Sequence, residues 1–223
     1  MTGKTLRFGL AAAIVACMCA AVQRGSGQVV TNQELSTRSV RAEESQLACL
    51  VADSARAATG ADVVLITAIA FHEVTLPRGT LDASEVLRCL ANPEDTLVLV
   101  RLTGEQLRRG LEHALALYPQ RNPAFLQVSG LFVVALYNPA QDVQIVSVKV
   151  GKELLDEKRE YTVAMPMPLA HGHLGFARIW DKASILRDTK RTLASAVEDY
   201  CSTLRTLSEK PEPRILIRKA GDR

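Results

Sequence analysis

The spacing of apolar positions first indicates a helix. From residue 43 to residue 59, apolar and small side chains recur every three to four positions, and Gly60 follows where a helix commonly ends in a left-handed residue. The next apolar run, residues 63–66, is continuous, short and rich in β-branched side chains, which predicts a buried strand. Residues 82–85 and 103–106 have the spacing of a capping box, so we expect a helix to begin at each of them.

The rest of the chain is mostly a pattern of short strands. Alternating or β-branched runs lie at residues 96–102, 125–128, 131–137, 143–150 and 161–165. Helical spacing returns at residues 189–207, and the prolines within residues 211–213 would stop that helix. Helices and strands in this order predict a mixed α/β fold, with α+β layers packed in a single domain over residues 43–208.

The segments that flank this predicted domain lack periodic apolar positions. Residues 28–42 are polar and aperiodic, which predicts a linker, and order is expected to begin near Glu43. Residues 209–223 carry mixed charge with an excess of bases, which predicts a flexible basic tail.

Residues 1–27 have the pattern of an export signal peptide. Two basic residues, Lys4 and Arg7, precede an apolar run at residues 8–22, which is shorter than the stretch of about 20 residues that crosses a bilayer. Small residues end at Gly27, so the mature chain is expected to start at Gln28 and to be exported to the periplasm, cell envelope or extracellular space. Two alternatives keep the same compartment: lipidation of Cys17, and an uncleaved anchor.

Charge argues against a nucleic-acid partner. The first 27 residues contain three bases and no acid, so the remaining chain has 24 basic and 24 acidic residues, and the formal net charge of +3 disappears. A protein that neutralises phosphates needs an excess of Lys and Arg. No nucleic-acid binding is therefore expected.

Cysteine and histidine are too sparse for a metal centre. Beyond the signal, Cys49, Cys89 and Cys201 lack the spacing of a zinc site, and their odd number rules out a disulfide scaffold. Cys49 and Cys89 are expected to be core residues on helices, with a single disulfide bridge as the alternative. Among the four histidines only His171 and His173 lie close in sequence, whereas a transition-metal site needs three or four ligands. We expect no metal or other cofactor in this chain.

Several sequence blocks resemble a known family. They are ESQLACLVAD at residues 44–53 with ATGAD at 58–62, LTGEQL at 102–107, FLQVSGL at 125–131, and VKVGK at 148–152 with YTVA at 161–164. In order and spacing these blocks resemble the carboxy-terminal domain of the 5'-nucleotidase / UDP-sugar hydrolase family, over roughly residues 43–180. The resemblance implies a substrate-recognition domain; in that family a separate metallophosphatase domain binds two divalent metal ions and cleaves the phosphoester. This chain matches no part of that domain, so the resemblance implies no catalytic residues and no activity alone.

The family's ligand-binding loops differ most in this sequence. Where the family has an Asn-Gly-Gly-Gly-Ile-Arg segment, His72 replaces the arginine and Ile69 fills a glycine position. One ring of the family's aromatic clamp corresponds to Phe125, which is interpreted either as a ligand platform or as a strand residue packed in the core. The block that supplies the second ring corresponds to residues 166–176, in which Pro168 replaces the ring.

This degenerate block keeps three candidate ligand contacts, and Leu174 replaces its acidic residue. With Phe125 and His72, the candidate substrate-binding residues are therefore His171, Gly172 and Phe176.

Two functions follow from the resemblance. In the first, the chain is the nucleotide-recognition subunit of a split nucleotidase and docks on a separately encoded metallophosphatase. In the second, it is a catalytically dead binding or interaction domain with a degenerate ligand site. In both, a nucleotide or nucleoside is expected to bind weakly, since one ring and an arginine of the family site are missing.

Overall fold

The computed structural model describes residues 27–139, 141–204, 206–207 and 213–221. Its centre is a five-stranded sheet in the order β12-β6-β11-β3-β7, where β3 and β11 are parallel and the other pairs antiparallel. The bounds of these strands are β3 Val63–Thr67, β6 Thr96–Thr103, β7 Leu126–Ser129, β11 Glu160–Pro166 and β12 Ile185–Thr192. The predicted mixed α/β class is confirmed.

The central strand β3 is buried on both faces, as its continuous apolar run predicts. Val64 and Ile66 belong to one apolar cluster, whereas Val63 and Leu65 belong to the other. Successive side chains of a strand point to opposite faces, so this sheet separates two cores. The first core lies under α1 (Gln46–Thr59) and α5 (Leu193–Thr203), and the second lies under α3 (Gly104–Leu115) and α4 (Met167–Ala170).

Predicted helix boundaries agree with the observed caps. Gly60 follows α1 with a φ of 67°, and its N–H donates to the Arg56 carbonyl. At the start of α3, the Gln106 amide N–H donates to Thr103 Oγ1, and the Gln106 side chain accepts from the Thr103 N–H. The same box, between Asp82 and Glu85, opens α2 (Ala83–Leu87). The cap signals located these ends because they depend on local spacing.

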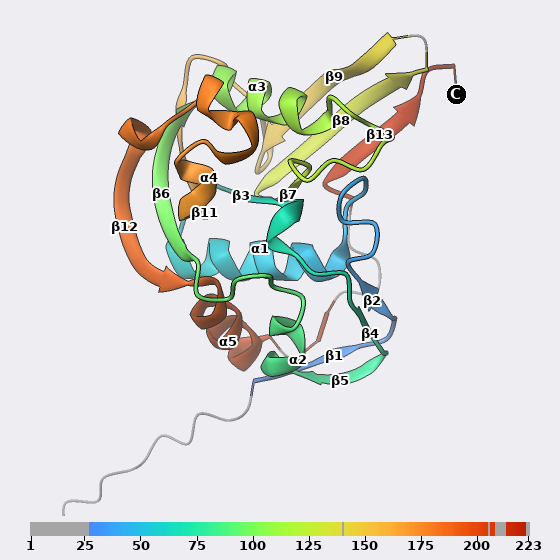
Figure 1. Cartoon of the computed structure of the whole chain (residues 1–223), viewed down its shortest axis with the longest axis vertical. Coiled ribbons are helices and arrows are strands. Elements are labelled where there is room, and N and C mark those ends of the chain that lie inside the picture. The colour runs from blue at the N-terminus through green and yellow to red at the C-terminus, as the bar shows by residue number, and fades with distance from the viewer. Residues whose placement is uncertain (1–26, 140, 205, 208–212, 222–223) are drawn as a thin grey trace, which may run out of the picture.

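A second sheet stands beside α3 and has the order β10-β9-β8-β13 (Figure 1). It contains β8 (Leu131–Asn138), β9 (Gln141–Val150), β10 (Glu153–Leu154) and β13 (Ile215–Lys219). β13 pairs in parallel with β8, with Ile215 opposite Val133. The prediction of a flexible tail at residues 209–223 is therefore wrong for β13, because a five-residue strand that pairs with a distant segment leaves little periodic signal.

The prediction of a linker at residues 28–42 is also wrong. β1 (Gln28–Thr31) pairs with β5 (Gly79–Asp82), and β2 (Leu35–Ser36) pairs with β4 (Thr75–Leu76). Val29, Leu35 and Val40 are buried in the first core. Leu35 and Val40 each stand between polar residues and Val29 is followed only by Val30, so no periodicity marks the segment. Ordered structure begins well before Glu43.

The predicted helix at residues 189–207 is shorter than expected. Its first part is the end of β12, an edge strand with two register shifts against β6, and α5 begins only at Leu193. Thr192 caps α5 by accepting from the Ser195 N–H. Because β12 is largely polar, an alternating pattern does not reveal it.

Gln127, in β7, holds the segment before α1 against the sheet. Its side chain is fully buried. The amide nitrogen donates to the carbonyls of Val40 and Glu43 at 3.0 and 2.9 Å, and the amide oxygen accepts from the Ser45 N–H at 3.0 Å. Three backbone groups thus depend on one side chain, which explains a glutamine inside the apolar FLQVSGL block.

The three described cysteines are free thiols and are buried, which confirms the core positions predicted for Cys49 and Cys89. Burial raises the pKa of Cys89 from 9.0 to about 12 and that of Cys201 to about 11. None of the helices in the described ranges is long and apolar enough to span a membrane. Cys17 and the predicted signal peptide, except Gly27, lie outside the described residues.

Replacing Gln127 with leucine should destabilise the domain by about 3 kcal/mol, because the buried Val40 carbonyl and Ser45 N–H would lose their partners at about 1–3 kcal/mol each, and the part-buried Glu43 carbonyl would add less. Urea unfolding followed by circular dichroism measures the change. The control is Gln144→Leu at an exposed position of β9, which should change the stability by less than about 0.5 kcal/mol. Equal effects of the two substitutions would contradict the role of Gln127.

The buried thiols should react slowly in the native protein. At about pH 8 a thiol whose pKa is raised this far is almost entirely protonated, and the thiolate is the reactive form. In a Cys17→Ser, Cys19→Ser variant, Ellman's reagent should detect the three remaining thiols only after denaturation. Rapid reaction of any of them in the folded protein would show that its surroundings are open to solvent.

Candidate functional site

The loops that the resemblance assigns to ligand contact meet at one edge of the five-stranded sheet. β3 and β11 are parallel, with Val63 opposite Val163, so their carboxyl ends lie at the same edge. β6 begins there too, because Pro166 at the end of β11 pairs with Leu97. The loops after β3, after β11 and before β6 are therefore neighbours.

The loop after β3 is held by its main chain. It contains a short 3-10 helix, η1 (Ala68–Ala70), in which the N–H groups of Ala68 and Ile69 donate to the carbonyls of Phe125 and Pro123 at 2.8 and 3.1 Å. The His72 N–H donates to the Cys89 carbonyl. This leaves Ile69 49% exposed and His72 exposed. An apolar side chain and a histidine thus project from a fixed backbone.

Phe125 is a core residue and does not present its ring to a ligand. Only 1% of it is exposed, and it packs in the first core with α1. Of the two interpretations of Phe125, the structure supports packing, since a ring already enclosed by side chains has no free face for a base. The expectation that Phe125 contacts a substrate is corrected accordingly.

Phe176 is buried in the second core. Its ring stacks on Trp180 at 4.7 Å and meets His113 edge-on at 4.7 Å. Because Phe125 and Phe176 lie in cores on opposite faces of the sheet, the two rings cannot enclose one base. The expectation for Phe176 is corrected for the same reason: its ring stabilises the fold.

His171 and Gly172 lie together directly after α4. His171 is exposed, whereas Gly172 is buried with a φ of 82°, and a Cβ at this glycine would lie 2.6 Å from the Ala177 Cα. Gly172 is therefore needed for the chain to turn closely past Ala177. Of the five predicted contacts, only His72 and His171 project side chains to solvent at this edge.

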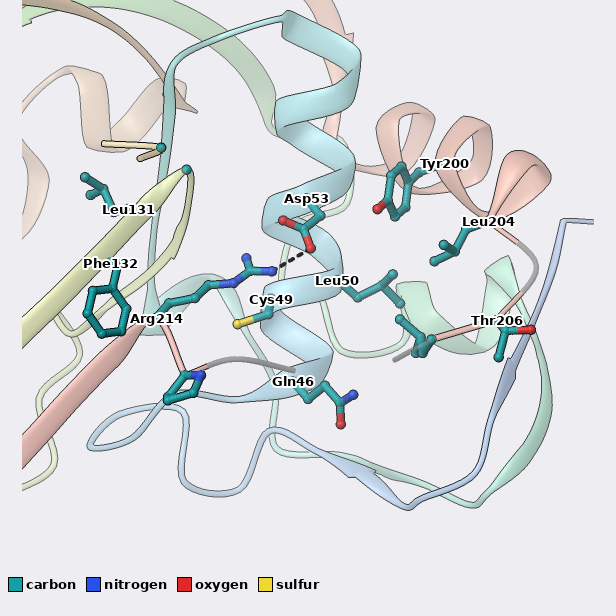
Figure 2. Close-up of a pocket in the computed structure, with 14 residues that line it drawn as sticks. Gln46, Cys49, Leu50, Asp53, Leu131, Phe132, Tyr200, Leu204, Thr206 and Arg214 are labelled. Atoms are coloured by element: carbon teal, nitrogen blue, oxygen red, sulfur yellow. Dashed lines mark hydrogen bonds and ion pairs between the residues drawn. The ribbon is translucent and has the colours of Figure 1, made fainter. Parts of the chain in front are cut away.

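A different part of the molecule contains a cavity of about 640 Å³ that the sequence did not indicate (Figure 2). It lies beside α1, between α5 and the start of β8. Its walls are mainly apolar, with a few polar groups on one side. The lining residues used below are Leu50, Asp53, Leu131, Phe132, Tyr200, Leu204 and Arg214.

An ion pair forms the polar wall of this cavity. Arg214 Nη2 lies 2.6 Å from Asp53 Oδ2, and Arg214 Nη1 donates to the Val128 carbonyl. Ser129 Oγ donates to Asp53 Oδ1 at 2.6 Å. Burial alone would lower the pKa of Arg214, but its hydrogen bond to Asp53 and the nearby carboxylates outweigh that effect and raise it. The guanidinium remains charged and orients Asp53.

Two further groups define the electrostatics beside the ion pair. Glu44 accepts hydrogen bonds from the N–H groups of Arg214 and Ile215, and from the thiol of Cys49. Burial raises the pKa of Tyr200, and the charge of Asp53 raises it further. The phenol therefore stays neutral and can donate a hydrogen bond.

The cavity lies away from the edge that carries the predicted ligand loops. In the pairing of β3 with β7, Thr67 lies opposite Leu126 and Val64 lies opposite Ser129. Gly130, which lines the cavity, therefore sits near the start of β3, whereas the loops follow its end. The site was missed because its partners, Asp53 and Arg214, are far apart in sequence and the second was assigned to a tail.

The arrangement of side chains does not fit a catalytic metal centre. Within the part of the chain that the structure describes, no three His, Cys, Asp or Glu side chains are grouped so as to hold a metal ion. These described residues therefore do not fit the pair of divalent ions that the resemblance assigns to the metallophosphatase domain.

Sequence comparisons identify the relatives of this chain. A profile described as the 5'-nucleotidase C-terminal domain matches residues 23–180. A 5'-nucleotidase-related protein of Glossina morsitans morsitans is 32% identical in an alignment of 209 positions that covers 84% of this chain and 37% of the relative. The 5'-nucleotidase of Mus musculus is 31% identical over 128 residues, 54% of this chain and 22% of the relative. The chain thus spans well under half of these relatives.

Comparison with solved structures agrees with the sequence comparisons. The 5'-nucleotidase precursor of Thermus thermophilus superposes with a TM-score of 0.73 and 26% identity, covering 85% of this chain and 39% of that one. The NAD nucleotidase of Haemophilus influenzae has the same TM-score at 17% identity, over 88% and 38% of the two chains, and supports the fold alone. Profile, relatives and architecture coincide: the chain belongs to the family of 5'-nucleotidase C-terminal domains.

Proposed function

We propose that this domain is the non-catalytic subunit of a split nucleotidase, and that it docks on a metallophosphatase domain carried by a separate polypeptide. In this proposal the partner holds the two divalent metal ions and cleaves the phosphoester. The chain is exported, as the pattern of its first 27 residues predicts. The lipidation of Cys17 remains the alternative form of the same export.

The observation that carries the proposal is the composition of the loop edge. Ile69 is 49% exposed there, on a backbone fixed by hydrogen bonds, while the rings of Phe125 and Phe176 are buried. An exposed apolar side chain on a rigid loop favours contact with a protein surface, since association removes it from water at about 25 cal/mol per Å². We expect the docking partner to be a metallophosphatase, because in the family a metallophosphatase domain accompanies the C-terminal domain.

Leu174 contributes less directly than Ile69 to the proposed docking surface. Its side chain packs partly against the second core, and its φ is 58°, a left-handed conformation that is uncommon for leucine. A charge placed at Leu174 would therefore test folding as well as docking. Ile69 alone is the better probe of the surface.

A second role, recognition of the nucleotide, is supported by the two exposed histidines at this edge. His72 and His171 project to solvent and can donate hydrogen bonds to a phosphate or a base. Without an accessible ring they supply polar contacts only. This role is therefore weaker than docking.

AMP should bind the full chain with a Kd of about 1 mM or weaker. Stacking of a base on one ring contributes about 1–3 kcal/mol, and both candidate rings are buried. Isothermal titration calorimetry measures the affinity. Micromolar binding that is lost in His72→Ala but retained in His113→Ala would favour a working nucleotide site over a docking surface.

Ile69→Asp should abolish capture of a metallophosphatase by the tagged chain from cross-linked envelope of the native host, as identified by mass spectrometry. A buried carboxylate at the contact would lack a partner. The thermal transition should stay nearly unchanged, because an exposed loop position contributes little to folding.

The matched control is Val146→Asp, at a position of β9 in the second sheet that is 57% exposed. It should leave the capture intact. The docking proposal fails if no metallophosphatase is captured by the wild-type chain, or if the two substitutions have the same effect.

A further inference from the structure

We propose that the cavity beside α1 is a second ligand site, and that it takes a small uncharged molecule with an apolar ring and a hydroxyl group. This inference is independent of the proposed function, because the cavity lies near the start of β3, away from the loop edge. It rests on the size, the walls and the polar groups of the cavity.

Size and walls suit a small organic molecule. A volume of about 640 Å³ lies within the roughly 300–1,000 Å³ of ligand pockets. Leu50 and Leu131 are almost fully buried behind the cavity, and Phe132 and Leu204 are half-buried at its sides. These side chains come from α1, β8 and the end of α5, so three separate elements fix the apolar walls.

Two of the polar groups that line the cavity, Tyr200 and Asp53, can bind a ligand hydroxyl. Tyr200 projects from α5 with its hydroxyl group turned towards Asp53 (Figure 2). Among the described residues, this hydroxyl has no hydrogen-bond partner. Each Asp53 oxygen accepts one hydrogen bond, from Ser129 or Arg214, which leaves acceptor capacity on both. A ligand hydroxyl can accept from Tyr200 and donate to Asp53 at the same time.

The balance of charge favours a neutral ligand. Asp53 is paired with Arg214, and Glu44 accepts hydrogen bonds from two N–H groups and one thiol. An anion such as a phosphate would meet the Asp53 carboxylate in the cavity wall, with the Glu44 carboxylate hydrogen-bonded to the Arg214 N–H behind it. A cation would meet Arg214, together with Arg56 in an adjoining hollow of about 370 Å³. Neither a negative nor a positive charge on the ligand would strengthen binding, so the hydroxyl group and the apolar ring of the ligand determine its affinity.

The test uses 2-naphthylmethanol as the probe and the full chain as the receptor. Saturation-transfer NMR and a titration should detect binding of this alcohol. Its carboxylate and methylammonium analogues should bind at least about tenfold more weakly, which corresponds to about 1.4 kcal/mol.

Two variants with matched controls locate the site. Tyr200→Phe removes only the hydroxyl and should weaken binding of the alcohol about fivefold, whereas Tyr137→Phe on β8 should have no effect. Leu204→Trp fills the cavity and should abolish binding, whereas Leu186→Trp, on an exposed position of β12, should not.

Tyr200→Phe has no hydrogen bond to lose, so its thermal transition should match that of the wild-type chain and any change in affinity reports the site. The proposal is overturned if the alcohol does not bind, if Tyr200→Phe and Leu204→Trp bind it as the wild type does, or if the charged analogues bind equally well. None of these outcomes bears on docking at Ile69.

Discussion

The domain depends on the hydrogen bonds of one buried amide. Gln127 joins β7 to the chain segment before α1, and it hydrogen-bonds the carbonyls of Val40 and Glu43 and the N–H of Ser45. Because Ser45 is also the N-cap of α1, the same side chain fixes where the helix begins. The position of α1 against the sheet then sets the first core, the Asp53–Arg214 ion pair and one wall of the cavity.

Much of the architecture could be predicted because its signals are local. The caps at Gly60 and Thr103 and the apolar run of β3 each depend on a few adjacent residues. The segments at residues 28–42 and 209–223 were missed because their strands gain stability from partners far away in sequence. A two- to five-residue strand has too few positions for a period to be recognised, so pairing alone defines it.

At the candidate site, a conspicuous family motif does not mark a residue that contacts a ligand. FLQVSGL is the most specific block of the resemblance, yet its residues serve packing: Phe125 lies in the core and Gln127 binds backbone. His72 and His171 are exposed at the loop edge, and their contact with a substrate stays a prediction. The cavity could not be predicted, since it needs Asp53 of α1 beside Arg214, and only the parallel pairing of β13 with β8 brings them together.

The pairing of β13 with β8 also bears on the order of folding. Val133 cannot pair with Ile215 until β13 has been synthesised, so a growing chain carries β8 unpaired on that side until Ile215–Lys219 is added. Contacts of such high sequence separation slow folding and leave an exposed strand edge open to wrong partners. The final kinetic step is therefore expected to be the closing of this edge, when Arg214 reaches Asp53 and Glu44.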